Sequence, residues 1–423
     1  MSKNCLSIFK SSIPNRKFGF RSLSTNKVIE REAKYGAHNY SPIPIAIAKG
    51  KGIYVWDVEG KKYFDFLSAY SAVNQGHCHP KIIKALHDQA DILTLTSRAF
   101  YNNVLGEYEE KACKLFGFDK LLPINTGVEA GETGIKLARK WGYLVKGIPT
   151  NQAKIVFCTN NFWGRTIGAI SSSTDPVATN DFGPFLPGYE LVPYNDLNAL
   201  EKALKDPTVC SFMVEPIQGE AGVVVPDDGY LREVRRLCTE NKVLWIADEV
   251  QTGLGRTGKL LACDHENVKP DILLLGKALS GGVLPASAAL ANDEVMTTLK
   301  PGQHGSTYGG NPLACKVAMA ALDVLIEEKL SENATNMGEI LRGELSKLPS
   351  EIIKTVRGRG LFNAIVIDKK YNAWEICLKL AENGLLAKPT HGDIIRFSPP
   401  LVINESEIRE CANIIKKTVE SLN

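Results

Sequence analysis

The sequence predicts an α/β protein built on a mostly parallel sheet, and two patterns in the middle of the chain support this fold class. One is a set of short, continuous apolar runs, which are typical of strands buried on both faces of a parallel sheet. The other is the amphipathic stretch between such runs, for example Leu231–Asn241, because alternating strands and helices indicate βαβ units. The predicted strands are Lys154–Cys158, Ser211–Glu215, Val243–Asp248 and Asp271–Leu275.

The C-terminal part has a different pattern, which predicts a second, smaller α+β domain. Two long helices are expected directly after Asn311-Pro312, and short strands then alternate with helices to the end of the chain. The expected helices are Leu313–Glu328, Ser331–Leu348, Trp374–Asn383 and Glu405–Leu422, and the expected strands are Phe362–Ile367 and Asp393–Phe397.

Near the N-terminus, residues 50–66 are expected to form a two-stranded hairpin that turns at Glu59-Gly60. An isolated hairpin is not stable, so this one is expected to pack against the smaller domain. The predicted organisation is a leader at 1–27, an N-terminal segment packed with the small domain at 28–75, a large α/β domain at 76–312 and a small α+β domain at 313–423.

Composition excludes several classes of protein. The chain has 423 residues, of which 44% are hydrophobic and 23% charged, as in soluble globular proteins. With 50 basic against 47 acidic residues, the net charge of +3 is too small to indicate a nucleic-acid-binding protein. No run of 18 apolar residues predicts a membrane span. Ten dispersed cysteines, without zinc-like spacing, favour a reduced compartment and indicate no metal site.

The positive charge is concentrated in the first 27 residues, which carry six basic side chains and no acidic one. Without them the chain has 44 basic and 47 acidic residues, a net charge of −3. A basic, Ser-rich, acid-free start is typical of a mitochondrial transit peptide, with Arg21–Ser24 as a plausible processing region. The predicted location is the mitochondrial matrix. A disordered basic tail on a cytoplasmic protein is the alternative.

One glycine motif suggests a nucleotide site that its context does not support. Residues 253–258 match the spacing Gly-x-Gly-x-x-Gly after a predicted strand. A dinucleotide-binding fingerprint should open a helix in the first βαβ unit, whereas Lys259–Asn267 shows no amphipathic pattern. We therefore expect a flexible loop there.

Two other segments are better candidates for chemistry. In Asn125–Glu132, Thr126 and Glu129 have capping-box spacing before a helix predicted over Thr133–Lys146. A glycine at that helix start allows an anion to approach free N–H groups, although an ordinary capped helix has the same signature.

The second segment is a pair of strand ends. Asp248 ends one predicted buried strand and Lys277 follows the next. Ligands of open α/β sheets bind at this edge, and a buried lysine can act as a nucleophile. Either residue alone is as well explained by a structural ion pair.

Six motifs in order carry a family resemblance. They are Asn125–Glu132, Asn161–Arg165, Glu215–Glu220, Asp248–Gly253, Gly276–Gly282 and His304–Pro312. Together they resemble a fold-type I, class-III pyridoxal-phosphate aminotransferase, from about residue 28 to the C-terminus. Within that family, Tyr35–Tyr40 and Lys388–Arg396 are similar to the ornithine aminotransferases. The resemblance implies the cofactor pyridoxal 5'-phosphate, and it makes a non-catalytic binding protein a distant alternative.

The resemblance also implies roles at the cofactor. Lys277 would bond covalently to the cofactor aldehyde and later carry the proton, while Asp248 would keep the pyridine nitrogen protonated. The other implied contacts are Phe162 stacked on the ring, Gln251 on its phenolic oxygen, the N–H groups of Gly127 and Val128 on the phosphate, and Thr307 on the phosphate of a neighbouring subunit. The last contact implies a homodimer or a higher homo-oligomer.

At the substrate, the resemblance implies that Tyr40 and Arg165 hold the α-carbon end of ornithine and that Tyr70 lines the same pocket. Arg396 would clamp the α-carboxylate of 2-oxoglutarate. Glu220 would mask Arg396 while ornithine is bound, unless the two form a permanent ion pair. The predicted reaction is ping-pong transfer of the δ-amino group of ornithine to 2-oxoglutarate or another 2-oxo acid. Acetylornithine or 4-aminobutyrate as the amino donor is the alternative.

Overall fold

The large sheet has seven strands, and the computed structural model describes it within residues 24–422. Its strands, in spatial order, are β4 (Lys120–Ile124), β10 (Ser287–Ala291), β9 (Ile272–Leu275), β8 (Leu244–Asp248), β7 (Val209–Val214), β5 (Lys154–Cys158) and β6 (Tyr189–Val192). The five strands from β9 to β6 pair in parallel, and β10 runs antiparallel to both of its neighbours. The four predicted strands and the predicted parallel α/β fold are confirmed. The sequence patterns did not predict the short strands β4, β6 and β10.

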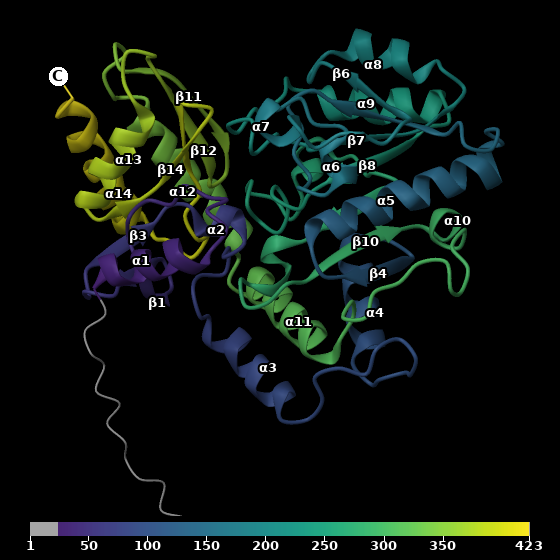
Figure 1. Cartoon of the computed structure of the whole chain (residues 1–423), viewed down its shortest axis with the longest axis horizontal. Helices are drawn as coiled ribbons and strands as arrows, with labels where there is room; N and C mark the ends of the chain where they lie inside the picture. Colours follow the sequence, from purple (N-terminus) through teal and green to yellow (C-terminus); the bar gives the residue numbers. More distant parts are fainter. Residues whose placement is uncertain (1–23, 423) are drawn as a thin grey trace, which may run out of the picture.

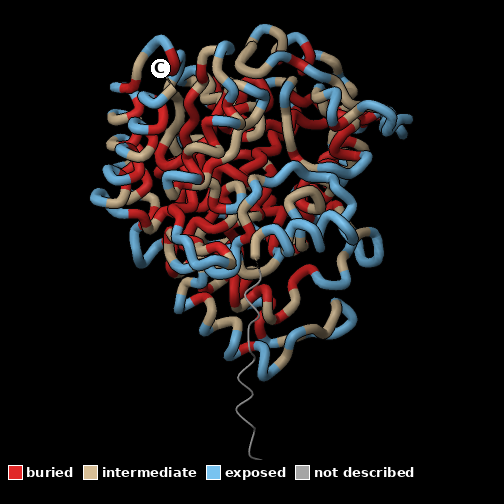
Figure 2. The backbone as a smooth tube through the Cα atoms, turned by 60° about the vertical axis from the view of Figure 1, so that its left-hand side comes forward, coloured by how far each residue is buried: buried red, intermediate tan, exposed pale blue. Residues whose placement is uncertain are grey.

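Helices cover both faces of this sheet (Figure 1). In β8, Ile246 packs in one apolar cluster with α5 (Gly127–Trp141), whereas Trp245 and Ala247 belong to a cluster with α8 (Leu197–Leu204) and α9 (Tyr230–Glu240). Burial on both faces explains why β8 is a continuous apolar run rather than an alternating one. The buried residues accordingly fill the centre of the molecule (Figure 2).

Two four-stranded sheets lie to the left of the large sheet in Figure 1. The first joins β1 (Ile47–Lys51), β2 (Tyr54–Asp57), β3 (Lys62–Asp65) and β13 (Leu385–Leu386), and the second joins β11 (Ile353–Arg359), β12 (Phe362–Ile367), β15 (Ile394–Phe397) and β14 (Lys388–Thr390). The predicted hairpin is confirmed as the antiparallel pair β2–β3. Because β3 also pairs in parallel with β13, the N-terminal segment shares a sheet with the C-terminal part of the chain.

The remaining helices connect or cover these sheets. The C-terminal ones agree with prediction: α11 (Pro312–Glu327), α12 (Leu330–Leu345), α13 (Ala373–Glu382) and α14 (Glu405–Glu420). The others are α1 (Thr25–Tyr35), α2 (Ser68–Ser71), α3 (Pro80–Ala90), α4 (Leu105–Phe116), α6 (Ile167–Ile170), α7 (Pro176–Thr179), α10 (Asp293–Met296), the π-helix η1 (Gly142–Lys146) and the 3-10 helices η2 (Ala262–Glu266) and η3 (Lys277–Ser280).

The predicted leader lies almost entirely outside the described residues, which begin at Ser24, and α1 follows at once. Within 24–422, no helix has both the length and the apolar character needed to cross a membrane. In the same range, no group of three or more His, Cys, Asp or Glu side chains is arranged to hold a metal ion.

Two local expectations need correction. The helix predicted from Thr133 begins at Gly127 instead, because Thr126 caps it there, and its last turn is the π-helix that ends at Gly147. The glycine segment 253–258 is a loop, but it is buried rather than flexible. The fully buried Arg256 fixes it by donating to the carbonyls of Leu361 at 3.0 Å and Pro399 at 2.6 Å.

Candidate active site

The structure brings Lys277 and Asp248 together at the carboxyl edge of the large sheet. Asp248 is the last residue of β8 and is 6% exposed, and Lys277 follows the neighbouring strand β9. Burial lowers the pKa of the Lys277 ammonium, while the carboxylates of Glu220, Asp248 and Glu215 oppose that shift. A lysine in this setting loses its proton more easily than one in water, as a nucleophile must.

A second buried carboxyl group lies beside Asp248. Glu215 follows β7, and its two oxygens accept hydrogen bonds from the backbone N–H of Phe162 at 3.0 Å and of Gly219 at 3.1 Å. Burial and the nearby Asp248 raise the pKa of Glu215 to about 8, and burial raises the pKa of Asp248 to about 6. Two neighbouring buried carboxyl groups favour a ligand that brings an N–H group or a positive charge.

The start of α5 lines a cavity together with Lys277. The side chains of Thr126 and Glu129 form a reciprocal capping box, which leaves the first N–H groups of the helix open at Gly127 and Val128. A cavity of about 310 Å³ is lined by Thr126, Gly127 and Lys277. A Cβ at position 127 would lie 2.8 Å from Val250, so only glycine fits there. The cavity therefore suits a phosphate group held by backbone amides.

Between the carboxylates and the helix start lie groups suited to an aromatic ring. Phe162, Glu215 and Asp248 line one small pocket. The side-chain oxygen of Gln251 is buried and has no hydrogen-bond partner, which leaves an acceptor for a hydroxyl group of a ligand. A phosphate, a ring with a protonated nitrogen and a ring hydroxyl are the features of pyridoxal phosphate. The residues present therefore fit this cofactor.

Arg396, Glu220 and Tyr70 form the opposite wall of the site. Arg396 on β15 is 4% exposed, and its Nη1 lies 2.7 Å from Oε1 of Glu220. Burial alone would raise the pKa of Glu220, but the charge and hydrogen bond of Arg396 lower it overall. The ring of Tyr70 lies over the guanidinium, 5.2 Å from Cζ, and the buried Nε of Arg396 has no partner. Arg396 thus retains a donor for a carboxylate.

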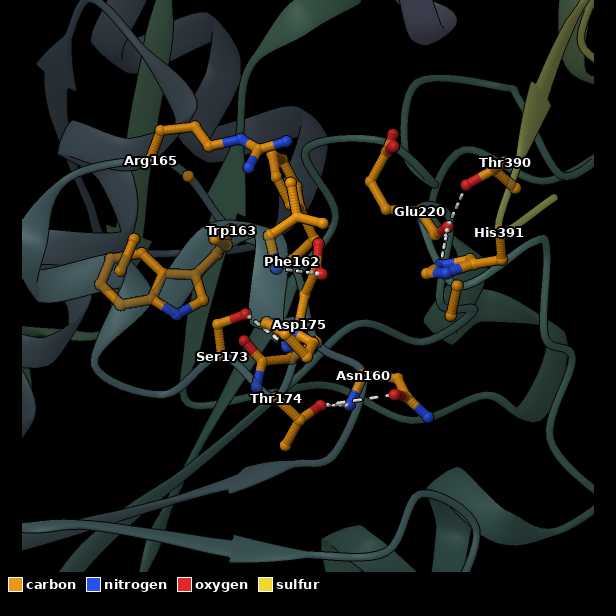
Figure 3. A pocket seen from close by; sticks show the side chains of 17 residues that line it. Asn160, Phe162, Trp163, Arg165, Ser173, Thr174, Asp175, Glu220, Thr390 and His391 are labelled. Carbon is orange, nitrogen blue, oxygen red and sulfur yellow. Dashed lines mark hydrogen bonds between the residues drawn. The ribbon is translucent and has the colours of Figure 1, made fainter. Parts of the chain in front are cut away.

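Glu220, Arg165 and His391 are among the residues that line a cavity of about 410 Å³ (Figure 3). Arg165 is exposed at its edge, with its guanidinium 5.4 Å from the ring of Phe162. Thr390 and His391 fix the turn at Glu220 through hydrogen bonds to its carbonyl oxygen, at 3.0 and 3.1 Å. These bonds hold the Glu220 backbone, whereas its carboxylate accepts hydrogen bonds from Nη1 of Arg396 at 2.7 Å and from Nε2 of Gln251 at 3.4 Å.

Two predicted residues lie apart from this set. Tyr40 is 71% exposed, although it is close enough to Tyr70 to help raise the pKa of that phenol, which burial raises most. Thr307 is exposed in the segment before α11, and its neighbour Ser306 accepts a hydrogen bond from Asn125 at 2.9 Å. A contact of Thr307 with another subunit stays a prediction.

Sequence reasoning assigned no role to Glu215, Thr390 or His391. Glu215 carries the same signal as Asp248, an acidic residue at the end of a buried apolar run. Thr390 and His391 act on the Glu220 carbonyl across 170 and 171 positions of sequence. No local pattern could have predicted that contact.

Comparisons with known proteins find one family over most of the chain. A family model described as Aminotransferase class-III matches residues 35–419. The protein named mitochondrial ornithine aminotransferase of Drosophila melanogaster is 70% identical over 93% of this chain and 92% of its own length. A crystal structure of the ornithine aminotransferase from Toxoplasma gondii is 50% identical, with a TM-score of 0.94 over 98% of this chain and 99% of that one. A structure named as the acetylornithine aminotransferase of Elizabethkingia anophelis is 56% identical, with a TM-score of 0.86 over 94% and 100%.

Proposed function

This chain belongs to the class-III aminotransferases, and we propose that it transfers the δ-amino group of L-ornithine to 2-oxoglutarate or another 2-oxo acid. The products are glutamate 5-semialdehyde and, from 2-oxoglutarate, glutamate. Aminotransferases of this class use pyridoxal phosphate, which accepts the amino group from one substrate and donates it to the next. The observation that carries the choice of substrate is the identity of 70% to a relative named for ornithine, over nearly its full length.

At the cofactor end, we assign Lys277 as the residue that holds the cofactor and moves the proton at the substrate carbon. Asp248 keeps the ring nitrogen protonated and Phe162 covers a ring face. Gln251 meets the ring hydroxyl, and Gly127 and Val128 bind the phosphate through their N–H groups. The buried Asp248, the unpartnered oxygen of Gln251 and the open start of α5 support these assignments.

At the substrate end, one site must take a δ-amine from ornithine and an α-amine from glutamate. We assign Arg396 to the α-carboxylate of 2-oxoglutarate and Glu220 as the group that masks Arg396 while ornithine is bound. The ion pair at 2.7 Å supports masking, and Thr390 and His391 bond to the backbone carbonyl of Glu220 rather than to its carboxylate. Tyr40 and Arg165 hold the α-carbon end of ornithine against Tyr70.

A substrate panel tests this proposal. Purified protein is mixed with 2-oxoglutarate and equal concentrations of ornithine, N-acetylornithine or 4-aminobutyrate, and the absorbance of the bound cofactor and the formation of glutamate are followed. We expect ornithine to give the highest kcat/KM. A higher value for either other amine would contradict the proposal.

N-acetylornithine is the second candidate, because a structural neighbour at 56% identity carries that name. Its δ-nitrogen is acylated and cannot react with the cofactor, so it must enter in the opposite orientation to ornithine. Tyr40→Phe distinguishes the two. The phenol matters if the α-carbon end of ornithine lies there, so kcat/KM for ornithine should fall, while that for N-acetylornithine, whose α-carbon end would lie at the cofactor, should not.

We further propose that the active unit is a homodimer, in which Thr307 of one subunit reaches the phosphate site of the other, and that the enzyme acts in the mitochondrial matrix. The exposure of Thr307 in the single chain and the mitochondrial names of relatives support these points. Sedimentation of the parent and Thr307→Ala proteins, with cofactor affinity as a second readout, tests the dimer.

We also propose a division into domains. Residues 76–312 form the large domain and residues 313–423 the small domain, with residues 28–75 packed on the small one.

A further inference from the structure

A strained turn lies beside the substrate end of the site. The four residues Ser68–Ser71 all have left-handed backbone angles, with φ between 48° and 70°. None of them is Gly, Asn or Asp, the residues that adopt this conformation at little cost. Strain of this kind persists only where the surrounding structure fixes it, and it is concentrated at functional sites.

Asp65, which precedes the turn at the end of β3, holds its start. Oδ1 of Asp65 accepts hydrogen bonds from the N–H of Leu67 at 2.9 Å and of Ser68 at 2.8 Å. Oδ2 lies 2.7 Å from Nε2 of His77. Asp65 is 8% exposed, so both of its oxygens act in a nearly water-free setting.

His77 is itself fixed by the backbone of the turn between β1 and β2. Its N–H and C=O both bond to Gly52, at 2.8 and 2.9 Å. Its ring lies so close to Gly50 that a Cβ there would approach within 2.9 Å. The His77 ring therefore has little freedom to leave Asp65, and the pair forms a rigid support under the turn.

The turn presents Tyr70 to Arg396. The Tyr70 ring covers one face of the guanidinium, 5.2 Å from Cζ. The strand before the turn is tied to the strand that carries Arg396, because the N–H of Ser398 donates to the carbonyl of Phe66 at 2.7 Å. With one face covered, Arg396 meets a carboxylate only in the plane of its N–H groups, the geometry of a bidentate pair.

We propose that Asp65 and His77 are positioning residues for substrate binding, which hold the left-handed turn so that the Tyr70 ring stays on Arg396. The inference rests on the proposed function, since it takes Arg396 and Tyr70 as the wall that receives the substrates. Neither Asp65 nor His77 touches the reacting atoms. Loss of either side chain should therefore raise KM for the substrates more than it lowers kcat.

The experiment compares Asp65→Ala with Asp57→Ala in the cofactor-loaded enzyme. Asp57 is a matched control: it is also 8% exposed, its Oδ1 accepts the N–H of Glu59 and Lys61, and its Oδ2 accepts the hydroxyl of Tyr63. For Asp65→Ala we expect KM for ornithine and 2-oxoglutarate to rise about 10- to 100-fold, with kcat within about threefold. Asp57→Ala should keep both KM values close to the parent.

A second readout needs no turnover. Glutarate, a dicarboxylate without the keto group, is titrated into each variant by calorimetry, and its affinity should fall in Asp65→Ala but not in Asp57→Ala. His77→Ala should show the same change to a smaller extent. If Asp65→Ala does not fold, His77→Ala takes its place in the comparison.

Rescue tests the role of backbone strain. Ala69 is exposed in the turn, and glycine adopts its conformation without strain. Asp65→Ala with Ala69→Gly should therefore recover part of the lost affinity for glutarate and both substrates. Unchanged KM in Asp65→Ala, equal changes in Asp57→Ala, or no rescue would overturn the proposal. A parent enzyme inactive with ornithine would instead overturn the proposed function, and the glutarate comparison would still test Asp65.

Discussion

The cofactor end of the site is built within one sheet, whereas the substrate end is built from segments far apart in the sequence. Asp248 is the last residue of β8, and Glu215 and Lys277 follow the neighbouring parallel strands β7 and β9. Tyr70 and Arg396 come from a strained turn and from a strand of another sheet. Regular strands thus fix the groups that we assign to the cofactor, and long-range contacts fix the groups that we assign to the substrate.

The two ends also differ in how their charges are balanced. At the cofactor end, Glu215 and Asp248 have raised pKa values, so these buried carboxyl groups have too little positive charge around them. At the substrate end, Arg396 already neutralises Glu220 and lowers its pKa overall, despite the opposing effect of burial. A ligand that brings positive charge would balance the buried carboxyl groups of the cofactor end. At the substrate end, a substrate carboxylate must compete with the ion pair between Arg396 and Glu220.

The largest expected effect tests whether the cofactor end carries the chemistry. If Lys277 holds the cofactor and moves the proton as proposed, Lys277→Ala removes both roles, so kcat should fall by at least about 10³-fold. Stopped-flow measurement of each half-reaction checks this. Lys146→Ala is the control, since Lys146 is also half-buried with a lowered pKa caused first by burial, but bonds only to the carbonyls of Val209 and Asn241. Parent-like turnover in Lys277→Ala would contradict the proposed mechanism.

The next effect concerns charge at the ring nitrogen. Asp248→Asn keeps the shape of the side chain but removes the negative charge, so kcat should fall by about 10²- to 10³-fold. KM for both substrates should change little, because Arg396 is intact. Asp271→Asn is the control: Asp271 precedes the neighbouring strand β9 and pairs with Arg235 at 2.8 Å. A rise in KM without a fall in kcat would show that Asp248 belongs functionally to the substrate end.

A third test uses the stability of the cofactor-free protein. A carboxyl group whose pKa is higher in the folded state stabilises the fold at low pH, and this contribution is lost as pH rises toward the folded pKa. For Glu215 the loss extends from about pH 4.5 to about pH 8, whereas Asp248, with a pKa of about 6, is half titrated at pH 6 and contributes little above pH 7. The free energy of unfolding should therefore fall by about 2 kcal/mol between pH 6 and 8 on account of Glu215.

Urea denaturation across this range measures the effect. Glu215→Gln should reduce the fall, because glutamine does not titrate. Glu266→Gln is the matched control, since Glu266 is 9% exposed and also accepts two backbone N–H groups, from Gly229 and Arg232. Equal pH dependence in Glu215→Gln and the parent would show that Glu215 is not the group responsible.

The same contrast explains how much could be predicted from the sequence. Asp248 and Lys277 were recognisable because each follows a continuous apolar run, and parallel strands bring such ends to one edge. The start of α5 was recognisable from Thr126 and Glu129, although the helix begins six residues earlier than its amphipathic pattern indicated. Local patterns therefore pointed to the residues that we assign to the cofactor.

The substrate end had no comparable local signal. Tyr70 and Arg396 were named from resemblance alone, and the support that Asp65 and His77 give to the turn was not foreseen. Ser68–Ser71 contain no residue that favours a left-handed conformation, so their backbone angles depend on tertiary contacts. The same holds for the strand β10, whose residues Ser287–Ala291 form a strand only because β4 and β9 flank them.

The smallest expected effect decides whether the substrate end is adjustable. Glu220→Gln keeps a side chain able to contact Arg396 but removes the charge that masks it, and a charge-assisted hydrogen bond is about twice as strong as a neutral one. KM for 2-oxoglutarate should therefore fall, and the ratio of kcat/KM for ornithine to that for glutamate should drop by about 10-fold. Glu220→Asp, which keeps the charge, is the control. If the ratio is unchanged in Glu220→Gln, Glu220 and Arg396 form a permanent structural pair, and selection between the two amino groups must lie with Tyr40, Arg165 and the turn that holds Tyr70.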